Sequence, residues 1–252
     1  MKNVIFKSAI FAIISVIVMI GVRTIFGTDA SLVDVGGLSA FVTVFGTLFG
    51  IMAAFVVFEV WGQYNKTTTL IEGEAQGLER LYRLTLYFRD PKLTKAMLEG
   101  IKAYANIVIE GKFQNLGAGE RNVVASKVFR NISAVIRDIT FNDDHDPVVY
   151  DHIVDHYGKL SETRTQRLSQ SLARMPVLLK AFLYITSAMA LFTFVVMPFT
   201  NIWYGALAVA VLGFVFAMVF QLVEDLDNPF VGNWNITPEP FERALRHIEE
   251  DY

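Results

Sequence analysis

Two histidines near the middle of the chain come closest to a metal-binding pattern. His152 and His156 flank Asp155, and on a helix their rings would share one face. Two imidazoles and a carboxylate form a ligand set that zinc accepts. A solvated acidic helix face, or a helix start capped by Asp146 with Pro147 next, explains the same residues. The two histidines are therefore weak metal candidates, and no cofactor is expected.

The sequence has no pattern typical of catalysis. It contains no cysteine, so disulfides and thiolate metal sites are excluded. A Glu placed as general base, a Gly-rich phosphate loop and a Ser-His-Asp pattern are all missing. The net charge is -3, and no run of Lys and Arg offers a surface for nucleic-acid phosphates. We therefore expect neither an enzyme nor a nucleic-acid-binding protein.

A row of small and hydroxyl side chains lies in an apolar segment near the amino end. Its members recur every three or four residues, so on a helix they form one stripe. We call this the Thr/Gly stripe, and it consists of Thr43, Gly46, Thr47, Gly50 and Ala54. Small residues four apart let membrane helices pack closely. Hydroxyls at one-turn spacing also suit the wall of an ion path, so both interpretations stay open at this point.

Charged residues next to apolar segments need partners. Glu59 follows the Thr/Gly stripe, and Lys180 lies about one turn inside the third apolar segment. For Lys180 the alternatives are pairing and snorkelling to water. The fourth apolar segment ends in Glu224, Asp225 and Asp227, whose charge adds to the negative end of a helix dipole. A neighbouring Lys or Arg, a bound cation or water should compensate it.

The composition indicates a membrane protein with four spanning helices. Hydrophobic residues make up 53% of the 252 and charged residues 19%, and the mean hydropathy is +0.41, whereas soluble domains carry about 25% charge. Lipid offers no partner to exposed backbone, so segments near 20 residues long should be helices. They are 4–25, 38–61, 175–198 and 202–223. The first, with Lys2 before it and Lys7 just inside it, could also be a secretory signal, although 21–24 is a poor cleavage site.

The polar middle of the chain predicts further helices. Apolar periodicity continues from the second span until Asp90-Pro91, and additional helices are expected at 92–109, 121–139 and 147–172. We thus expect an all-α membrane protein with spans one and two in 1–61, a cytoplasmic helical domain in 62–174, spans three and four in 175–223 and a cytoplasmic segment in 224–252.

The last segment predicts one more helix. Thr237 would cap it, Pro238 would be its first residue, and Phe241, Leu245 and Ile248 would share a face that needs a partner surface.

Basic residues predict the orientation. They precede the first span and follow the second, at Lys66, Arg80, Arg83 and Arg89, while the link between these spans holds only Arg23 beside Asp29 and Asp34. The positive-inside rule therefore places both termini and the middle domain in the cytoplasm.

Two segments resemble bestrophins, a family of membrane ion channels. The apolar run 45–64, with its glycines and with Trp61 and Tyr64 at its end, looks like the bestrophin second helix. The segment 224–230, EDLDNPF, with 238–241 and 245–249 after it, resembles the region following the bestrophin fourth helix. The likeness to the bacterial bestrophin-like domain family is closer still, and it is carried by Trp61, Glu74-Ala75, Pro176 and the turn Asp227-x-Pro229-Phe230.

The resemblance implies a homopentamer in a bacterial inner membrane that passes small monovalent ions. Matching Gly50, Trp61 and Tyr64 puts Thr43, Thr47 and Ile51 at the neck, with Ala54 also lining the path, while Gly46 and Gly50 pack neighbouring helices. Rings of Thr would wet this neck more easily than the bulky apolar residues of bestrophins.

Ion sign and regulation follow less directly. Asp29, Asp34 and Glu59 slightly favour cations over anions. Calcium activation is not expected, because 231–235 replaces the family's acidic run and Asp225 and Asn228 supply too few oxygens. A non-conducting scaffold or sensor that uses the cytoplasmic domain is the alternative.

Overall fold

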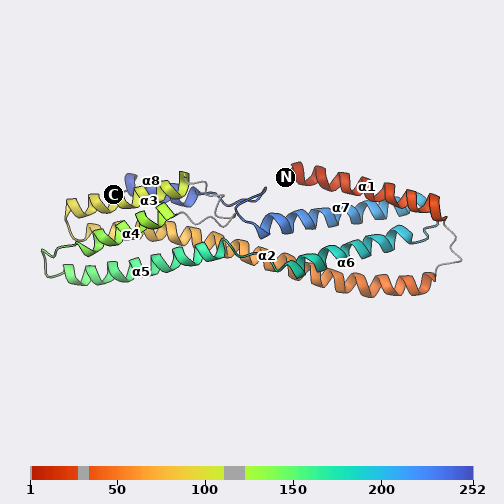
Figure 1. The fold of residues 1–252 in the computed structure, drawn as a ribbon, viewed down its shortest axis with the longest axis horizontal. Coiled ribbons are helices and arrows are strands. Elements are labelled where there is room, and N and C mark those ends of the chain that lie inside the picture. Colours follow the sequence, from red (N-terminus) through yellow and green to blue (C-terminus); the bar gives the residue numbers. More distant parts are fainter. Residues whose placement is uncertain (1, 28–33, 111–122, 252) are drawn as a thin grey trace. The chain divides into compact units, whose positions relative to one another are not determined.

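The computed structural model describes residues 2–27, 34–110 and 123–251, and these are helical, without a strand (Figure 1). In chain order the helices are α1 (Lys2–Phe26), α2 (Val35–Leu86), α3 (Pro91–Glu110), α4 (Val123–Arg137), α5 (Asp146–Gln170), α6 (Val177–Val196), α7 (Ile202–Asp227) and α8 (Glu239–Glu250). The predicted all-α class is confirmed for these residues.

The chain forms two compact units. The first unit combines Met1–Gly62 with Arg174–Asp227, and the second combines Gln63–Ala173 with Asn228–Tyr252. The single helix α2 begins in the first unit and ends in the second.

Among the described residues, four helices are long and apolar enough to cross a membrane: α1, α2, α6 and α7. The third predicted span is too long at its end, because α6 stops at Val196 and Met197 is extended. Met197 precedes Pro198, and proline disfavours a helical conformation in the residue before it. Helix α7 continues beyond the fourth predicted span to Asp227 and includes the acidic residues.

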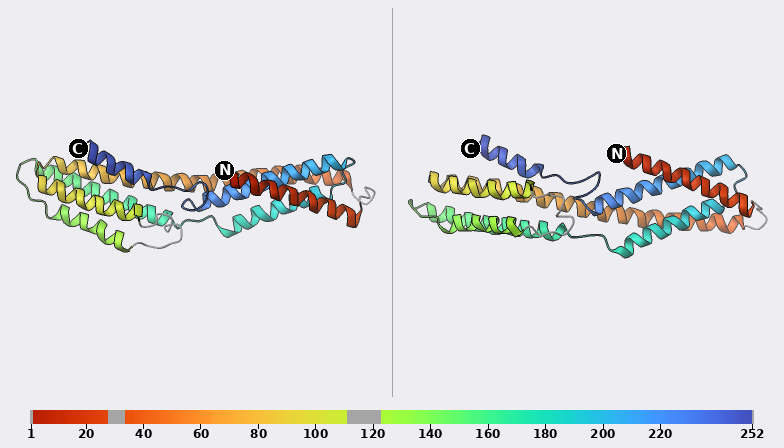
Figure 2. Two further views of the ribbon diagram at one scale, coloured as in Figure 1. Left: turned by 90° about the horizontal axis from the view of Figure 1, so that it is seen from above. Right: turned by 45° about the horizontal axis from the view of Figure 1, so that its top comes forward.

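In the first unit α1 lies along α7 (Figure 2). The buried face of α1 has small residues, among them Ser8, Ala12 and Ser15. Gly213 of α7 lies so close that a Cβ there would be 2.8 Å from Ser15 Oγ. The Gln221 side chain donates to Ser8 Oγ at 2.9 Å. Close contact between small residues, together with hydrogen bonds between helices, is how membrane helices associate without a hydrophobic driving force.

Arg23, in the last turn of α1, caps another helix. Its Nη2 donates to the Met197 carbonyl oxygen at 2.6 Å, and its guanidinium lies 5.6 Å from the centre of the Phe199 ring. The last carbonyls of a helix have no partner inside that helix. Arg23 therefore satisfies one just beyond the end of α6.

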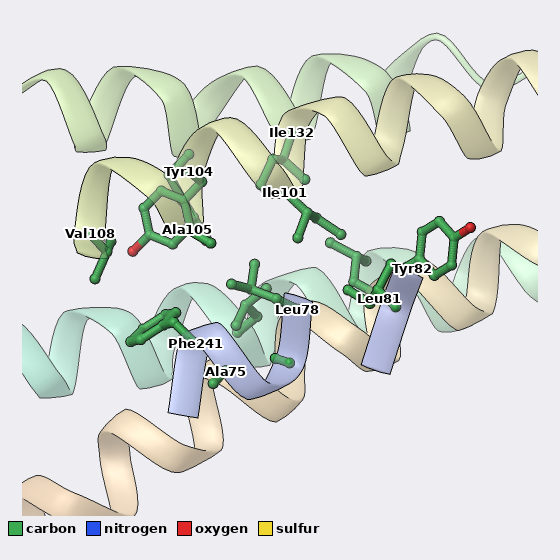
Figure 3. Packing of buried hydrophobic residues seen from close by; sticks show 14 of the residues in the cluster. Ala75, Leu78, Leu81, Tyr82, Ile101, Tyr104, Ala105, Val108, Ile132 and Phe241 are labelled. Atoms are coloured by element: carbon green, nitrogen blue, oxygen red, sulfur yellow. The ribbon is translucent and has the colours of Figure 1, made fainter. Parts of the chain in front are cut away.

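The second unit has one hydrophobic core, formed by the second half of α2 with α3, α4, α5 and α8 (Figure 3). As predicted, α2 continues through this unit as one helix and stops before Pro91. Asp90 Oδ1 accepts the Lys92 N–H at 2.8 Å, so α3 begins with a carboxylate cap and proline at its first position.

The predicted cap of α5 is wrong. Asp146 is buried, and its Oδ2 accepts the N–H groups of Asn142 and Asp143 at 2.7 and 3.0 Å. The carboxylate thus binds the turn that precedes α5. The N-cap residue is His145, which makes no side-chain capping bond. For α4, the predicted start at Arg121 lies outside the described residues.

The carboxyl-terminal helix α8 docks on the second unit, as predicted. Phe241 is fully buried and Ile248 nearly so, and Phe241 belongs to the same hydrophobic cluster as Ala75 and Leu78 of α2 (Figure 3). Its predicted start is one residue early and its predicted cap is wrong, because Pro238 is the N-cap and makes no side-chain bond to the first turn.

We predict that Gly213→Val loosens α1 from α7, because the new methyl groups must displace Ser15. Overpacking of this kind costs about 1–3 kcal/mol, and thermal unfolding in detergent would show the lower stability. Gly21→Val in α1 is the matched control, since a Cβ at Gly21 meets no atom within 4 Å among the described residues. Equal effects of the two substitutions would contradict the packing described above.

Candidate pore-lining site

The apolar part of α2 is the least covered of the four apolar helices. Only 6% of its most apolar window is buried, against 22% in α1, 22% in α6 and 28% in α7. Every member of the Thr/Gly stripe is exposed. A Cβ at Gly46 or Gly50 would meet no described atom within 4 Å, apart from the helix's own backbone. Within the described chain, therefore, these two glycines pack against no other helix.

Three phenylalanines of α2 form a row that reaches α7. Phe41 stacks on Phe45 and Phe45 on Phe49, with ring centroids 5.3 and 6.5 Å apart. The Phe49 ring then meets the Phe216 ring of α7 edge-on at 5.3 Å. At about 100° per residue, this row lies nearly opposite the Thr/Gly stripe. The stripe thus faces away from α7.

The threonine hydroxyls of the stripe already donate hydrogen bonds within α2. Thr43 Oγ1 donates to the Ser39 carbonyl and Thr47 Oγ1 to the Thr43 carbonyl, each at 2.9 Å. A threonine hydroxyl has one proton and two lone pairs. In this arrangement the exposed oxygens can accept a hydrogen bond or contact a cation, but they have no proton to give to an anion.

The other residues predicted near the path have different surroundings. Ile51 and Ala54 are exposed on α2, as is Glu59. Asp34 Oδ1 accepts the Gly37 N–H at 2.9 Å, so this carboxylate caps the first turn of α2. Asp29 lies outside the described residues.

Lys180 compensates the acidic end of α7. Its Nζ lies 3.1 Å from Glu224 and 2.7 Å from Asp227. Tyr184 donates its hydroxyl proton to Glu224, and Asp227 Oδ1 accepts the Met175 N–H at 2.5 Å. Of the compensating groups that the sequence left open, the structure shows the lysine. The cluster joins the start of α6 to the end of α7.

Asn228, Pro229 and Phe230 of the predicted carboxyl-terminal turn belong to the second unit. Phe230 is fully buried in its core. The Asn228 side chain accepts the Phe230 N–H at 3.4 Å, and the Pro229 carbonyl accepts the Ile236 N–H at 2.7 Å. Asp225 is half-buried at the end of α7. These contacts give the turn a structural role.

The two histidines of α5 have separate environments. His152 is exposed, whereas His156 is half-buried with its Nε2 2.9 Å from the Gly77 carbonyl oxygen of α2. No group of three His, Asp or Glu side chains suited to a metal occurs within the described ranges. Burial lowers the pKa of His156, and the hydrogen bond to Gly77 only partly opposes this.

Sequence reasoning missed a buried charged cluster in the second unit. Glu74 is completely buried, and its Oε2 lies 2.5 Å from Arg167 Nε. Tyr104 and Arg164 complete the cluster. A signal was present, because Glu74 occupies a position in the apolar row that includes Ile71, Leu78 and Leu81, and a carboxylate in such a row needs a buried partner.

Comparison with known proteins assigns the class and then the family. Four apolar helices in an all-helical fold define an integral membrane protein. The bestrophin-like domain model matches residues 9–241, and the chain belongs to that family, as the resemblance predicted.

Solved structures share the fold. A bacterial bestrophin homologue from Klebsiella pneumoniae, solved as a point mutant, has a TM-score of 0.69 at 11% identity, covering 99% of this chain and 98% of its own. A second structure, of a point mutant described as a membrane protein, has a TM-score of 0.71 at 11% identity, covering 98% of each chain. No curated protein sequence matches the chain.

We predict that His156 makes the second unit less stable in acid. The unfolded chain binds the proton near pH 6.5, but the folded pKa is lower. The stability contributed by neutral His156 is therefore complete above that pH and is lost as the pH falls through the folded pKa. His156→Gln should reduce the drop in thermal stability between about pH 7.5 and 5.5, while His152→Gln at the exposed neighbour should not. A loss as steep with His156→Gln as in the unaltered protein would refute this.

Proposed function

We propose that the chain is a subunit of a homopentameric ion channel in which small monovalent ions pass along the Thr/Gly stripe of α2. The observation that carries this proposal is the exposed polar stripe on the face turned away from α7. In a monomer this stripe would face lipid, which offers its oxygens no partner. A ring of α2 helices would enclose it and let water reach it.

The glycines of the stripe suit such a ring. Gly46 and Gly50 are open on the surface of α2, so a second copy of the helix can approach closely there. Closed rotational symmetry then turns one exposed face into a shielded path. In this arrangement Thr43, Thr47 and Ile51 form the neck. The bestrophin family supports the proposal, because its members form oligomeric channels and are not enzymes.

Cations are slightly favoured over anions. The hydroxyl protons of Thr43 and Thr47 are donated within α2, which leaves lone pairs toward the proposed path. Glu59 would add a ring of carboxylates, which favours cations. Asp34 supports this less than expected, because its carboxylate is used to cap α2.

The proposed topology has four spans, with both termini and the second unit in the cytoplasm of a bacterium and the spans in its inner membrane. The distribution of basic residues supports it. Arg23 is the basic residue of the first external link, and it binds a carbonyl next to the end of α6.

Reconstitution tests conduction. Purified protein in liposomes should pass small monovalent ions, and Thr47→Phe should abolish most of the flux by narrowing and drying the neck. Phe45→Leu, on the face toward α7, is the control and should change flux much less. Intact oligomers without flux would favour the alternative of a scaffold or sensor. Equal responses to the two substitutions would show that the stripe serves packing.

The mass of the assembly tests the ring. We expect light scattering in detergent to give five copies of the 28.3 kDa chain after subtraction of the detergent. A monomer or dimer would contradict the ring, because neither encloses the stripe on all sides.

A further inference from the structure

The buried cluster of the second unit ties α2 to α5 and α3. The Glu74 carboxylate of α2 accepts from Arg167 of α5, with Nε–Oε2 at 2.5 Å, and from the Tyr104 hydroxyl of α3. Arg164 Nε donates to the Tyr104 oxygen at 3.0 Å. Buried ion pairs add little to stability, because desolvation offsets their attraction, but in some proteins they select one arrangement of helices over others.

The contact between α2 and α5 is close on both sides of Glu74. A Cβ at Gly77 would be 2.7 Å from Leu160 Cδ1, and a Cβ at Gly73 would be 3.7 Å from Thr163 Cγ2. With Arg167, these α5 residues lie on one helix face, and their order runs opposite to that of α2. The two helices are thus antiparallel, and at Gly77 the side chain that lies between them is that of Leu160.

This geometry permits one rotation and one register of α2. Turning α2 about its axis by one residue would bring the side chain of Ala75 or Gly73 to Arg167, and sliding it by one turn would bring Leu70 or Leu78. Each alternative leaves the buried guanidinium without a carboxylate, which is costly. Only the observed arrangement satisfies both the glycine contact and the charge.

The charges of the cluster make the arrangement of α2 against α5 depend further on Glu74. Arg164 and Arg167 carry two positive charges, and burial, followed by the effect of the Glu74 carboxylate, raises the pKa of Tyr104, so its hydroxyl stays neutral. Arg167 Nη1 is buried without a hydrogen-bond partner among the described residues. Without the Glu74 carboxylate, the buried Arg167 would lose its counter-charge and be driven toward water.

We propose that Glu74 is a positioning residue that sets the rotation and register of α2 against α5 through Arg167. Because α2 is one helix from Val35 to Leu86, a rotation of α2 at this contact would also rotate Thr43 and Thr47 about the helix axis. Continuous helices carry such coupling between distant sites. The consequence for Thr43 and Thr47 rests on the proposed function, whereas the α2–α5 contact itself does not.

The first test measures the α2–α5 contact inside the second unit. The chain has no cysteine, so Gly73→Cys with Thr163→Cys supplies the only thiol pair, and mild oxidation should join it. Adding Glu74→Gln should slow this cross-linking several-fold in assemblies of unchanged mass. Glu249→Gln is the control, because it removes the exposed Lys102–Glu249 pair at 2.6 Å and leaves the α2–α5 contact intact.

The second test measures the direction of the stripe. In the full-length oligomer, a water-soluble thiol reagent should label Thr47→Cys faster than Phe45→Cys, and Glu74→Gln should bring the two rates together. If the rates are already equal without Glu74→Gln, the proposed pore face is wrong, and the cross-linking result still decides the role of Glu74.

Unchanged cross-linking in intact Glu74→Gln assemblies would overturn the proposal. If this variant does not assemble, Arg167→Lys takes its place, since it keeps the charge but loses the fork of donors. It should slow cross-linking to a smaller extent, and an unchanged rate would again overturn the proposal.

Discussion

A polar group that faces lipid has no water to bind, and this constraint accounts for most of the specific contacts of the apolar helices. The threonines of the stripe donate to carbonyls of their own helix. Gln221 bonds to α1, and Arg23 to the carbonyl of Met197. Lys180 lies between two carboxylates at the end of α7. The lone pairs of the exposed threonine oxygens of α2 can still accept hydrogen bonds. This free accepting capacity is the basis for proposing a water-filled path beside α2.

The positions of the helices follow from the sequence, because they depend on local patterns. The run of apolar positions from Leu70 to Leu86 predicted that α2 continues past the last membrane-like residue, and Pro91 marked where the next helix begins. The docking face of α8 followed in the same way from Phe241 and Ile248. Errors occurred at helix ends, where a single residue decides. Pro198 keeps Met197 out of α6, and Asp146 binds the turn before α5 instead of the first turn of that helix.

Partners between helices were less predictable. Periodicity shows which face of a helix is buried but not which helix covers it, so the pairing of Lys180 with Glu224 and Asp227 was one of several alternatives. The cluster around Glu74 was missed altogether, since its members lie up to 93 positions apart in the sequence. Similarly, α1 packs on α7 through Gly213, while a Cβ at Gly46 or Gly50 of α2 would meet no other described helix.

Because α2 is one continuous helix, the number of residues between two of its side chains sets the angle between them about the helix axis. Each residue added to an α-helix rotates everything beyond it by about 100°. An insertion or deletion of one or two residues between Thr47 and Glu74 would therefore rotate the hydroxyls by about 100–200° about the helix axis relative to Glu74. A change of about seven residues, close to two full turns, would nearly restore their direction. Natural length variation in this part of the helix should accordingly come in whole turns, whereas the link after α3 is under no such restriction.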